Sequence, residues 1–246
     1  MLINKKIIVY LLLSFSIFFG YFLEENSSGG AKLDHQYLLP FIENFKIDLK
    51  NALNSFLSNR GSIIHSPAFY LLIGIILKFI DNIQAINIFY IIISCFIPFI
   101  LYLIILNKYK INFNYIYFFS LLIFLSPYFR SSAIWLLGDN LCILFFSLSI
   151  LFFLKTKIKK EEINNYYFTL FFLILCCYIR YYYCLFAFYF LFCFYQDLKF
   201  KQFIFLIILG IFLSIPAIYY LYYILTEYNF YGRISMYGSF NYYSNS

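Results

Sequence analysis

Charged residues are scarce in this chain of 246 residues: they make up 12% of it, whereas hydrophobic residues make up 64%. A soluble domain has roughly 25% charged and about 45–50% apolar residues. The shortage of charge therefore excludes an ordinary soluble domain and predicts an integral membrane protein. The formal net charge of +7 does not indicate nucleic-acid binding, because the basic residues lie in short clusters between apolar runs, as the positive-inside rule expects. We expect no nucleic-acid partner.

Cysteine motifs and glycine-rich phosphate loops are also missing. No CxxC spacing is present, and no cysteine falls in the polar loop that follows the first apolar run. These absences argue against a disulfide framework, a zinc site and a nucleotide site. We interpret the cysteines as small apolar packing residues of the membrane helices. They are Cys95, Cys142, Cys176, Cys177, Cys184 and Cys193.

What the sequence does contain is a series of apolar runs, the first of which has about 17 residues and is just long enough to cross the ~30 Å hydrocarbon core at 1.5 Å per helical residue. The first run could be a signal peptide, but no small-x-small cleavage site follows it before Glu24, so we expect an uncleaved helix. The fold class we predict is all-α, a polytopic transmembrane helix bundle of about seven spans. The runs are Ile7–Leu23, Ala85–Leu106, Ile111–Pro127, Asn140–Leu154, Tyr166–Tyr178 or a little beyond, Tyr183–Tyr195 and Phe203–Leu225.

A polar-leaning loop, residues 24–84, separates the first run from the others. Apolar residues recur in it every three or four positions, which predicts an amphipathic helix over 36–58 lying on the membrane surface, with Pro40 in its first turn. Residues 67–80 are apolar but too few for an ordinary span, so we expect a second interfacial or re-entrant helix there. The apolar positions of the first helix are Leu38, Ile42, Phe45, Leu49, Leu53 and Phe56.

The lysine clusters predict the orientation of the chain. If residues 67–80 do not cross the membrane, all of these clusters fall on one side, which the positive-inside rule makes the cytoplasm. We therefore expect a cytoplasmic N-terminus and an external face that carries the 24–84 loop, Pro127–Asn140, the turn near Arg180 and the tail from Thr226. We also expect a single transmembrane domain that is a piece of a longer protein. The clusters are Lys5/Lys6, Lys108/Lys110, Lys155/Lys157/Lys159/Lys160 and Lys199/Lys201.

Two aspartates on the external face are candidate catalytic residues. Asp34 is either the N-cap of the surface helix or a general base held at the membrane. Asp139 opens an otherwise uncharged run, next to Asn140, and is either a helix cap or a functional carboxylate, since a charge at a membrane helix is costly unless it faces a cavity or a partner. Because both aspartates are expected on the same external face of the membrane, we favour the functional interpretation over helix capping.

The same face carries candidate binding residues. Arg180 lies among aromatic residues and either snorkels to headgroups or binds a lipid phosphate, because guanidinium matches phosphate in a bidentate fork. Arg130 and Arg233 are weaker candidates for the same role. The histidines His35 and His65 could join the two aspartates around a divalent ion, but their spacing does not demand it, and we assign no metal ligand.

The ordered set of these features resembles the GT-C superfamily of polytopic glycosyltransferases, in particular the mannosyltransferase-like and RgtA/B/C/D-like branches that use polyprenyl-phosphate sugars. A typical motif of that family reads His-Pro-Pro-Leu-Tyr-Tyr-Leu-Leu; here it is His65-Ser66-Pro67-Ala68-Phe69-Tyr70-Leu71-Leu72. The resemblance implies that Asp34 and Asp139 match the acidic positions of the first and second external loops, and that 36–58 and 67–80 are juxtamembrane helices. The family commonly has Asp-Glu where this chain has Asp34-His35, so Glu24 or Glu25 could supply a second carboxylate.

The resulting expectation is an inverting glycosyl transfer at the external face, from a polyprenyl-phosphate sugar donor to a lipid or glycan acceptor. Asp34 would be the base, Asp139 would orient the acceptor or Asp34, and Arg180 would hold the lipid phosphate, with His35, His65 and Asn140 as further substrate-binding residues. No cofactor is certain. Two alternatives remain open: a lipid-linked-sugar flippase or transporter, which would need charges near the bilayer midplane, and a non-catalytic membrane assembly protein, which would need no acidic pair.

Overall fold

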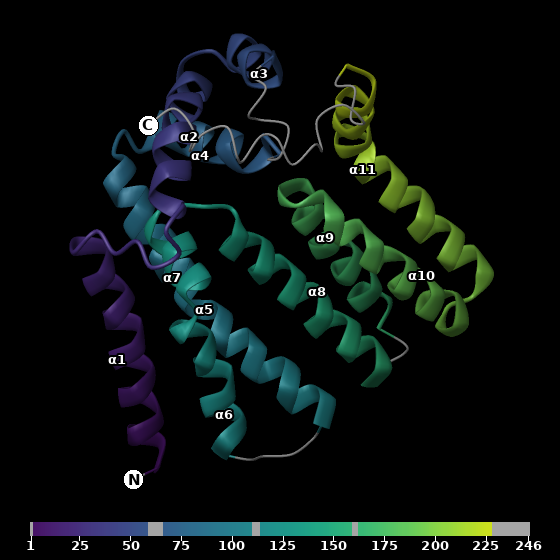
Figure 1. The fold of residues 1–246 in the computed structure, drawn as a ribbon. Helices are drawn as coiled ribbons and strands as arrows, with labels where there is room; N and C mark the ends of the chain where they lie inside the picture. The colour runs from purple at the N-terminus through teal and green to yellow at the C-terminus, as the bar shows by residue number, and fades with distance from the viewer. Residues whose placement is uncertain (1, 59–65, 110–113, 159–161, 228–246) are drawn as a thin grey trace, which may run out of the picture.

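A computed structural model describes residues 2–58, 66–109, 114–158 and 162–227, and in these residues the chain is helical without any strand. The all-α fold class is thus confirmed. Four helices are long and apolar enough to cross a membrane. They are α1 (Leu2–Phe22), α5 (Ile83–Tyr109), α8 (Asp139–Ile158) and α11 (Phe200–Glu227) (Figure 1).

The other expected spans appear as shorter helices. The described part of the run Ile111–Pro127 is α6 (Asn114–Leu121) followed by the 3₁₀ turn η2 (Leu122–Leu125), about 20 Å long in total. Ser126 ends this segment, and its hydroxyl accepts from the backbone N of Phe129 to cap α7 (Pro127–Ile134). The remaining two are α9 (Ile163–Ile179) and α10 (Leu185–Asp197), joined by the 3₁₀ turn η3 (Tyr181–Cys184). Helix length thus establishes four candidate spans in the described chain.

The polar loop folds into helices whose boundaries differ from the prediction. α2 (Ala31–Ile47) begins five residues before the expected start, so Pro40 lies in its middle and not in its first turn. The expected single helix is also broken at Asp48, whose carboxylate accepts hydrogen bonds from the backbone N of Lys50 at 2.9 Å and of Asn51 at 3.2 Å. Asp48 thereby caps a separate helix, α3 (Leu49–Ser58).

The predicted apolar face of this loop does form a core. Leu38, Ile42 and Phe45 of α2 are buried against α4 (Ala68–Phe79), which occupies the segment expected to be a second interfacial helix. Gly74 permits this close packing, because a Cβ at that position would lie only 2.5 Å from Cβ of Phe45. The two helices thus form one unit on top of the bundle (Figure 1).

Helix direction in the bundle follows from a few hydrogen bonds. α5 and α8 begin at the same end, because the Tyr90 hydroxyl near the start of α5 donates to the carbonyl of Leu137 just before α8 and accepts from the backbone N of Leu141. α9 runs antiparallel to α8, with the Ser149 hydroxyl donating to the carbonyl of Thr169 at 2.8 Å. The starts of α5 and α8 and the end of α9 therefore meet at one end of the bundle, which we call the loop end.

The opposite end, which we call the lysine end, carries the described residues of the basic clusters named above. The Tyr117 hydroxyl of α6 donates to the carbonyl of Lys6 near the start of α1, and Nζ of Lys157 near the end of α8 lies 2.5 Å from Oδ2 of Asp197 at the end of α10. At this end lie the first turns of α1, the end of α5, the start of α6, the end of α8 and the α10–α11 connection (Figure 1). The described lysines there are Lys5, Lys6, Lys108, Lys155, Lys157, Lys199 and Lys201.

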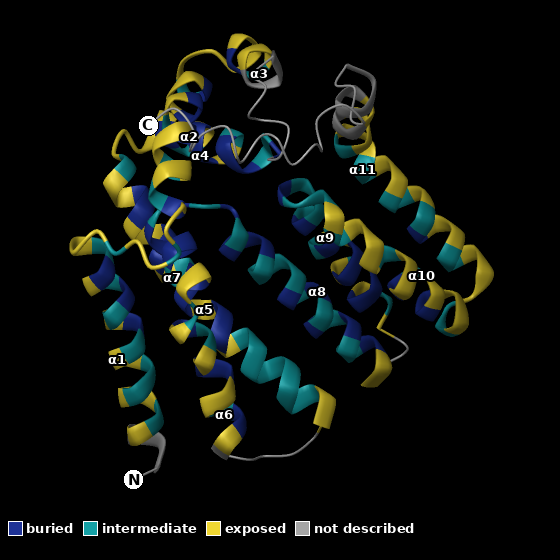
Figure 2. Cartoon of the chain, in the orientation of Figure 1, coloured by how far each residue is buried: buried dark blue, intermediate teal, exposed yellow. Residues whose placement is uncertain are grey.

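The outer surface of the bundle is apolar. α1 and α11 expose long rows of large hydrophobic side chains, such as Phe15, Phe19, Phe205 and Phe212, each more than half exposed. Figure 2 shows this exposure along the outer sides of both helices. Exposed apolar rows of this extent mark contact with lipid or with another apolar partner, and the length of the four candidate spans favours a membrane.

Candidate functional site

A polar cavity of about 560 Å³ lies at the loop end of the bundle. Its walls come from the segment after α1, from α2, η2 and α7, and from the facing ends of α8 and α9. Four of the residues singled out in the sequence line it, namely Asp34, Asp139, Asn140 and Arg180. They are separated by up to about 150 positions in the chain, so the fold alone brings them to one cavity.

The turn between α7 and α8 aims Asp139 at this cavity. Leu136 is buried in the turn with a positive φ of 51°, a conformation that a branched side chain rarely adopts and that the surroundings must enforce. The hydroxyls of Tyr90 and Ser132 both donate to the carbonyl of Leu137 and hold the turn in place. Gly138 follows, and a Cβ there would lie 2.9 Å from the Ile179 side chain at the end of α9. The α7–α8 turn and the end of α9 are therefore packed directly together.

Asp139 and Arg180 form an ion pair across this junction. Oδ1 of Asp139 accepts from Nε of Arg180 at 2.8 Å and lies 2.7 Å from Nη2. The Arg180 side chain is only 15% exposed, and that of Asp139 is 41% exposed. Burial by itself lowers the pKa of Arg180, but the neighbouring carboxylate outweighs this and raises it, so the guanidinium stays charged at the cavity wall. Asp139 thus holds Arg180, a role not among those expected for it.

Asp34 lies in the first turn of α2 and lines the same cavity. The N-cap interpretation of this residue is wrong, because α2 starts at Ala31 and its N-cap position is Gly30. The Asp34 residue is exposed, and within the described part of the chain its carboxylate makes no ion pair or hydrogen bond. A carboxylate with no protein partner at the wall of a cavity is available to a ligand.

Asn140 joins three helices behind the two charged residues. Its Nδ2 donates to Oγ of Ser94 at 3.1 Å and to the carbonyl of Phe129 at 3.0 Å, and its backbone N donates to Oγ of Ser132. The Asn140 side chain is buried, and its Oδ1 has no hydrogen-bond partner among the described residues. Its main visible contribution is to fix α5 and α7 against the start of α8.

Hydroxyl groups that the sequence analysis missed line the rest of the cavity. Ser131 accepts from the backbone N of Ser28 at 3.0 Å and shares a hydrogen bond with the Ser27 hydroxyl, which ties the segment after α1 to α7. Nothing in their sequence spacing indicates a site, because they come from segments about one hundred positions apart. The hydroxyl-bearing residues of the wall are Ser28, Ser126, Tyr128, Ser131, Ser132, Tyr182 and Tyr183.

A second ion pair, between Arg130 and Glu25, lies outside the cavity. It excludes Arg130 as a phosphate ligand and Glu25 as a second carboxylate of the site. Arg130 donates to both carboxylate oxygens of Glu25, at 2.8 and 2.5 Å, and to the Ser16 hydroxyl at 2.8 Å. This hydrogen bonding lowers the pKa of Glu25. Arg130 is thus a clamp between α1 and α7, and Glu25 is not a second carboxylate of the site. Neither is Glu24, which pairs with Lys32 at 2.5 Å.

His35 does not line the cavity, contrary to the expectation that it is a substrate-binding residue. His35 packs against Trp135, with ring centroids 6.0 Å apart, and is not among the residues that line the cavity. Burial lowers its pKa, which favours the neutral ring. His65 and Arg233 lie outside the described residues. Within the described ranges, no cluster of three or more His, Cys, Asp or Glu side chains could hold a metal ion.

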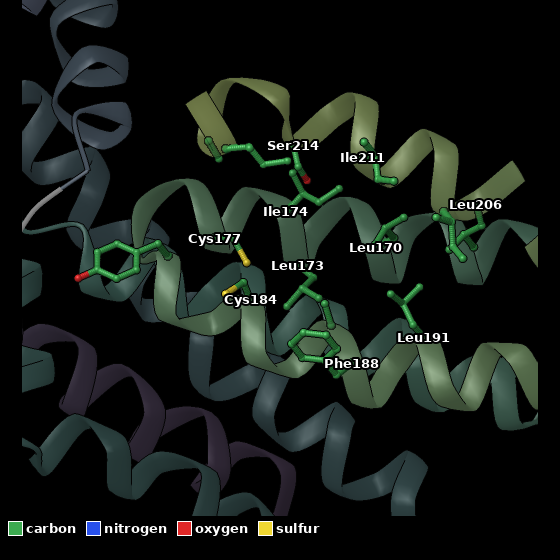
Figure 3. Close-up of a pocket in the computed structure, with 16 residues that line it drawn as sticks. Leu170, Leu173, Ile174, Cys177, Cys184, Phe188, Leu191, Leu206, Ile211 and Ser214 are labelled. Atoms are coloured by element: carbon green, nitrogen blue, oxygen red, sulfur yellow. The ribbon is translucent and has the colours of Figure 1, made fainter. Parts of the chain in front are cut away.

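An apolar groove of about 430 Å³ lies next to the polar cavity. It runs between α9, α10 and α11, and almost all of its wall is hydrocarbon, with side chains such as Leu173, Phe188 and Ile211 pointing into it (Figure 3). The turn η3 separates the two spaces: Tyr181 and Cys184 line the groove, whereas Tyr182 and Tyr183 line the cavity. Arg180 directly precedes this turn.

Protein-family models, curated proteins and solved structures gave no match to this chain. The resemblance to the GT-C superfamily therefore rests on the sequence motifs. The geometry of the cavity and the groove is the independent basis for a function.

Proposed function

We propose that this chain is a GT-C-like membrane glycosyltransferase that moves a sugar from a polyprenyl phosphate to an acceptor hydroxyl. The observation that carries the proposal is the composition of one cavity. The carboxylate of Asp34, which has no partner among the described residues, and the oriented guanidinium of Arg180 line a hydroxyl-rich space beside an apolar groove. This set matches what the reaction needs, namely a base, an anion-binding cation, sugar-binding hydroxyls and a place for a lipid tail.

The chemistry divides between the two charged side chains. Asp34 accepts the proton of the acceptor hydroxyl while the acceptor oxygen attacks the anomeric carbon of the sugar. The bond from that carbon to the phosphate oxygen breaks on the opposite face. The bonding electrons pass to the phosphate, and the anomeric configuration inverts. Arg180 stabilises the negative charge that grows on the leaving phosphate. A positioned general base typically contributes about 10²–10⁴-fold to such a rate.

Asp139 serves this chemistry through Arg180. Its carboxylate accepts from Nε of the guanidinium and so fixes the plane of that group at the cavity wall. The exposed part of Asp139 also lines the cavity, where it can accept a hydrogen bond from the bound sugar or acceptor. Asn140 supports this arrangement by fixing the start of α8 against α5 and α7.

The apolar groove suits the donor tail. A polyprenyl chain bound between α9, α10 and α11 would leave the membrane interior at η3, and its phosphate would then reach Arg180 at the start of that turn. The turn carries Tyr182 and Tyr183 toward the cavity, and tyrosines commonly occupy positions with one apolar and one polar neighbourhood.

The topology we propose has seven crossings, a cytoplasmic N-terminus and the loop end outside a bacterial plasma membrane. Its support is the separation of charge in the fold, since the described lysines of all four clusters lie at the end opposite the cavity. In this arrangement α2, α3 and α4 lie on the external surface, and α6 with η2, α9 and α10 cross the membrane as short helices.

Donor turnover in membranes tests the proposal. Membranes that contain the chain are incubated with a panel of polyprenyl-phosphate hexoses and pentoses and with lipid extract as acceptor. We expect one donor to be converted into polyprenyl phosphate and a glycosylated acceptor of inverted anomeric configuration. If no donor is consumed in membranes where a thermal melting transition shows that the protein is folded, the proposal is contradicted.

A lipid-linked-sugar flippase, the alternative function, would bind its lipid in the same apolar groove. A separate measurement must therefore distinguish transport from sugar transfer. A flippase moves the intact donor across vesicles without forming polyprenyl phosphate, and it needs no general base. Donor that changes leaflet but keeps its sugar in proteoliposomes, equally well with wild type and Asp34→Asn, would favour transport over transfer.

A further inference from the structure

Two buried thiols contact each other between α8 and α9. The Sγ atoms of Cys142 and Cys176 are 3.0 Å apart, which is closer than two sulfur atoms normally approach without a covalent bond. The residues are 1% and 0% exposed. α8 and α9 form the most extensive helix pair of the described chain, so the two cysteines are held together by the packing of both helices.

The position of this pair connects it to the candidate site. Cys142 lies one helical turn after Asp139, and Cys176 lies one turn before Arg180, whose backbone N donates to the Cys176 carbonyl at 2.9 Å. Cys142 also lines the polar cavity. The thiol pair and the Asp139–Arg180 ion pair therefore cross the same helix junction, one turn apart, at the loop end.

We propose that Cys142 and Cys176 form a disulfide in the mature protein. The proposal uses the orientation given under Proposed function, in which the loop end faces an oxidising compartment where disulfides persist. The oxidant is a disulfide carrier of the thiol–disulfide exchange class that meets the two helix ends before they close. The link joins the ends of α8 and α9 and so fixes the distance between the backbone of Asp139 and that of Arg180.

The Cys142–Cys176 disulfide forms by thiol–disulfide exchange in two steps. One cysteine loses its proton, and its thiolate attacks the carrier disulfide to form a mixed disulfide while one carrier sulfur leaves as a thiolate. The thiolate of the other cysteine then attacks the protein sulfur of this mixed disulfide, and the second carrier sulfur leaves. Two protons and two electrons pass from the cysteines to the carrier, which is released as a dithiol.

The other described cysteines show no such contact. Cys95 and Cys193 are buried and free. Cys177 and Cys184 both line the apolar groove, where Figure 3 shows them near each other, but their sulfurs make no direct contact comparable to that of Cys142 and Cys176. The sequence interpretation of all six cysteines as packing residues is revised here for one pair only.

Peptide mapping of the full chain tests the disulfide. Membranes are quenched in acid, denatured in an alkylating reagent without reductant, digested and analysed by mass spectrometry. We expect the Cys142 and Cys176 peptides to be joined and to separate after treatment with dithiothreitol. The link should be lost in Cys176→Ser and retained in the matched control Cys193→Ser, which removes a buried cysteine elsewhere. Full alkylation of Cys142 and Cys176 without reductant, or a Cys177–Cys184 link in their place, would overturn the assignment.

A second readout separates this proposal from the enzymatic one. Dithiothreitol should lower the apparent melting temperature of the wild type by about 5–10 °C and leave that of the Cys142→Ser/Cys176→Ser double variant unchanged. An identical response of both proteins would contradict a stabilising disulfide. Neither the map nor the melting shift depends on sugar transfer, so a missing link would leave the glycosyltransferase proposal standing, and a missing activity would leave the disulfide standing.

Discussion

Asp139 and Arg180 are 41 positions apart in the chain, yet Oδ1 of the first accepts from Nε of the second at 2.8 Å where the start of α8 meets the end of α9. The contact places a fixed guanidinium at the wall of the cavity that Asp34 lines from α2. A guanidinium that binds phosphate in a fork must be held in a plane, and the Asp139 carboxylate on Nε and Nη2 holds the Arg180 guanidinium in this way.

Replacement of Arg180 tests its role as the phosphate ligand. Arg180→Ala should lower the rate of sugar transfer by about 10²–10³-fold, because a positioned donor to a developing negative charge contributes that much. Arg180→Lys should recover only part of this loss, since an ammonium cannot form the planar fork. Initial rates in membranes are the measurement, with Lys50→Ala as the control, because Lys50 is an exposed cation on α3 away from the cavity. Equal rates for Arg180→Ala and Lys50→Ala would contradict the assignment.

A double-mutant cycle tests the Asp139–Arg180 pair itself. Asp139→Asn leaves a largely buried guanidinium without its carboxylate, so the folded state should lose about 1–2 kcal/mol, less than for a fully buried pair because Asp139 is partly exposed. In the double variant Asp139→Asn/Arg180→Ala, the loss of unfolding free energy should be smaller than the sum of the losses in the two single variants. Thermal unfolding in detergent measures all three variants. Strict additivity would mean that the two residues are not coupled.

Much of this arrangement was accessible from the sequence. The apolar runs predicted a helical chain with helices long enough to cross a membrane, and the lysine clusters indicated which connections share an end, so Asp34, Asp139, Asn140 and Arg180 could be grouped from the sequence alone. The start of α2 was missed because Gly30 caps it without any side-chain signal. The break at Asp48 was missed because the apolar periodicity continues through it.

Contacts between distant segments could not be predicted in this way. Arg130 was a candidate phosphate ligand until the structure brought Glu25 and Ser16 to it from 105 and 114 positions away. The Cys142–Cys176 contact and the serine wall of the cavity depend equally on helix packing. A sequence periodicity shows which face of a helix is apolar, but it does not show which residue of another helix will lie against it.

Glycine at position 20 is required by the Glu25–Arg130 clamp. A Cβ there would lie 2.3 Å from Oε2 of Glu25 and 3.2 Å from Nη2 of Arg130, so Gly20→Ala should displace the pair and cost about 1–3 kcal/mol. The control is Gly210→Ala in α11, where the new methyl would meet only the flexible end of Leu170 at 3.0 Å. Thermal unfolding should show a clearly lower melting temperature for Gly20→Ala and no such decrease for Gly210→Ala. A larger loss for Gly210→Ala would contradict this explanation.

The same clamp predicts a pH dependence of stability. Arg130 lowers the pKa of Glu25 below its ordinary value of 4.5, so Glu25 contributes stability that is fully present above about pH 4.5 and is lost as the pH falls through the lowered pKa. The wild type should therefore lose more stability than Glu25→Gln when the pH is lowered from neutrality to below this range. Melting temperatures of the two proteins across a pH series measure the difference. Parallel curves would show that the carboxylate of Glu25 is not stabilised by the clamp.

The most direct test of the central claim, that the loop-end cavity is a glycosyl-transfer site with Asp34 as its base, is the transfer rate of Asp34→Asn at saturating donor. The matched control is Glu43→Gln, which neutralises an exposed acid on the same helix that does not line the cavity. We predict a rate about 10²–10⁴-fold below wild type for Asp34→Asn and an unchanged rate for Glu43→Gln. A rate for Asp34→Asn within a few-fold of the wild type would contradict the claim.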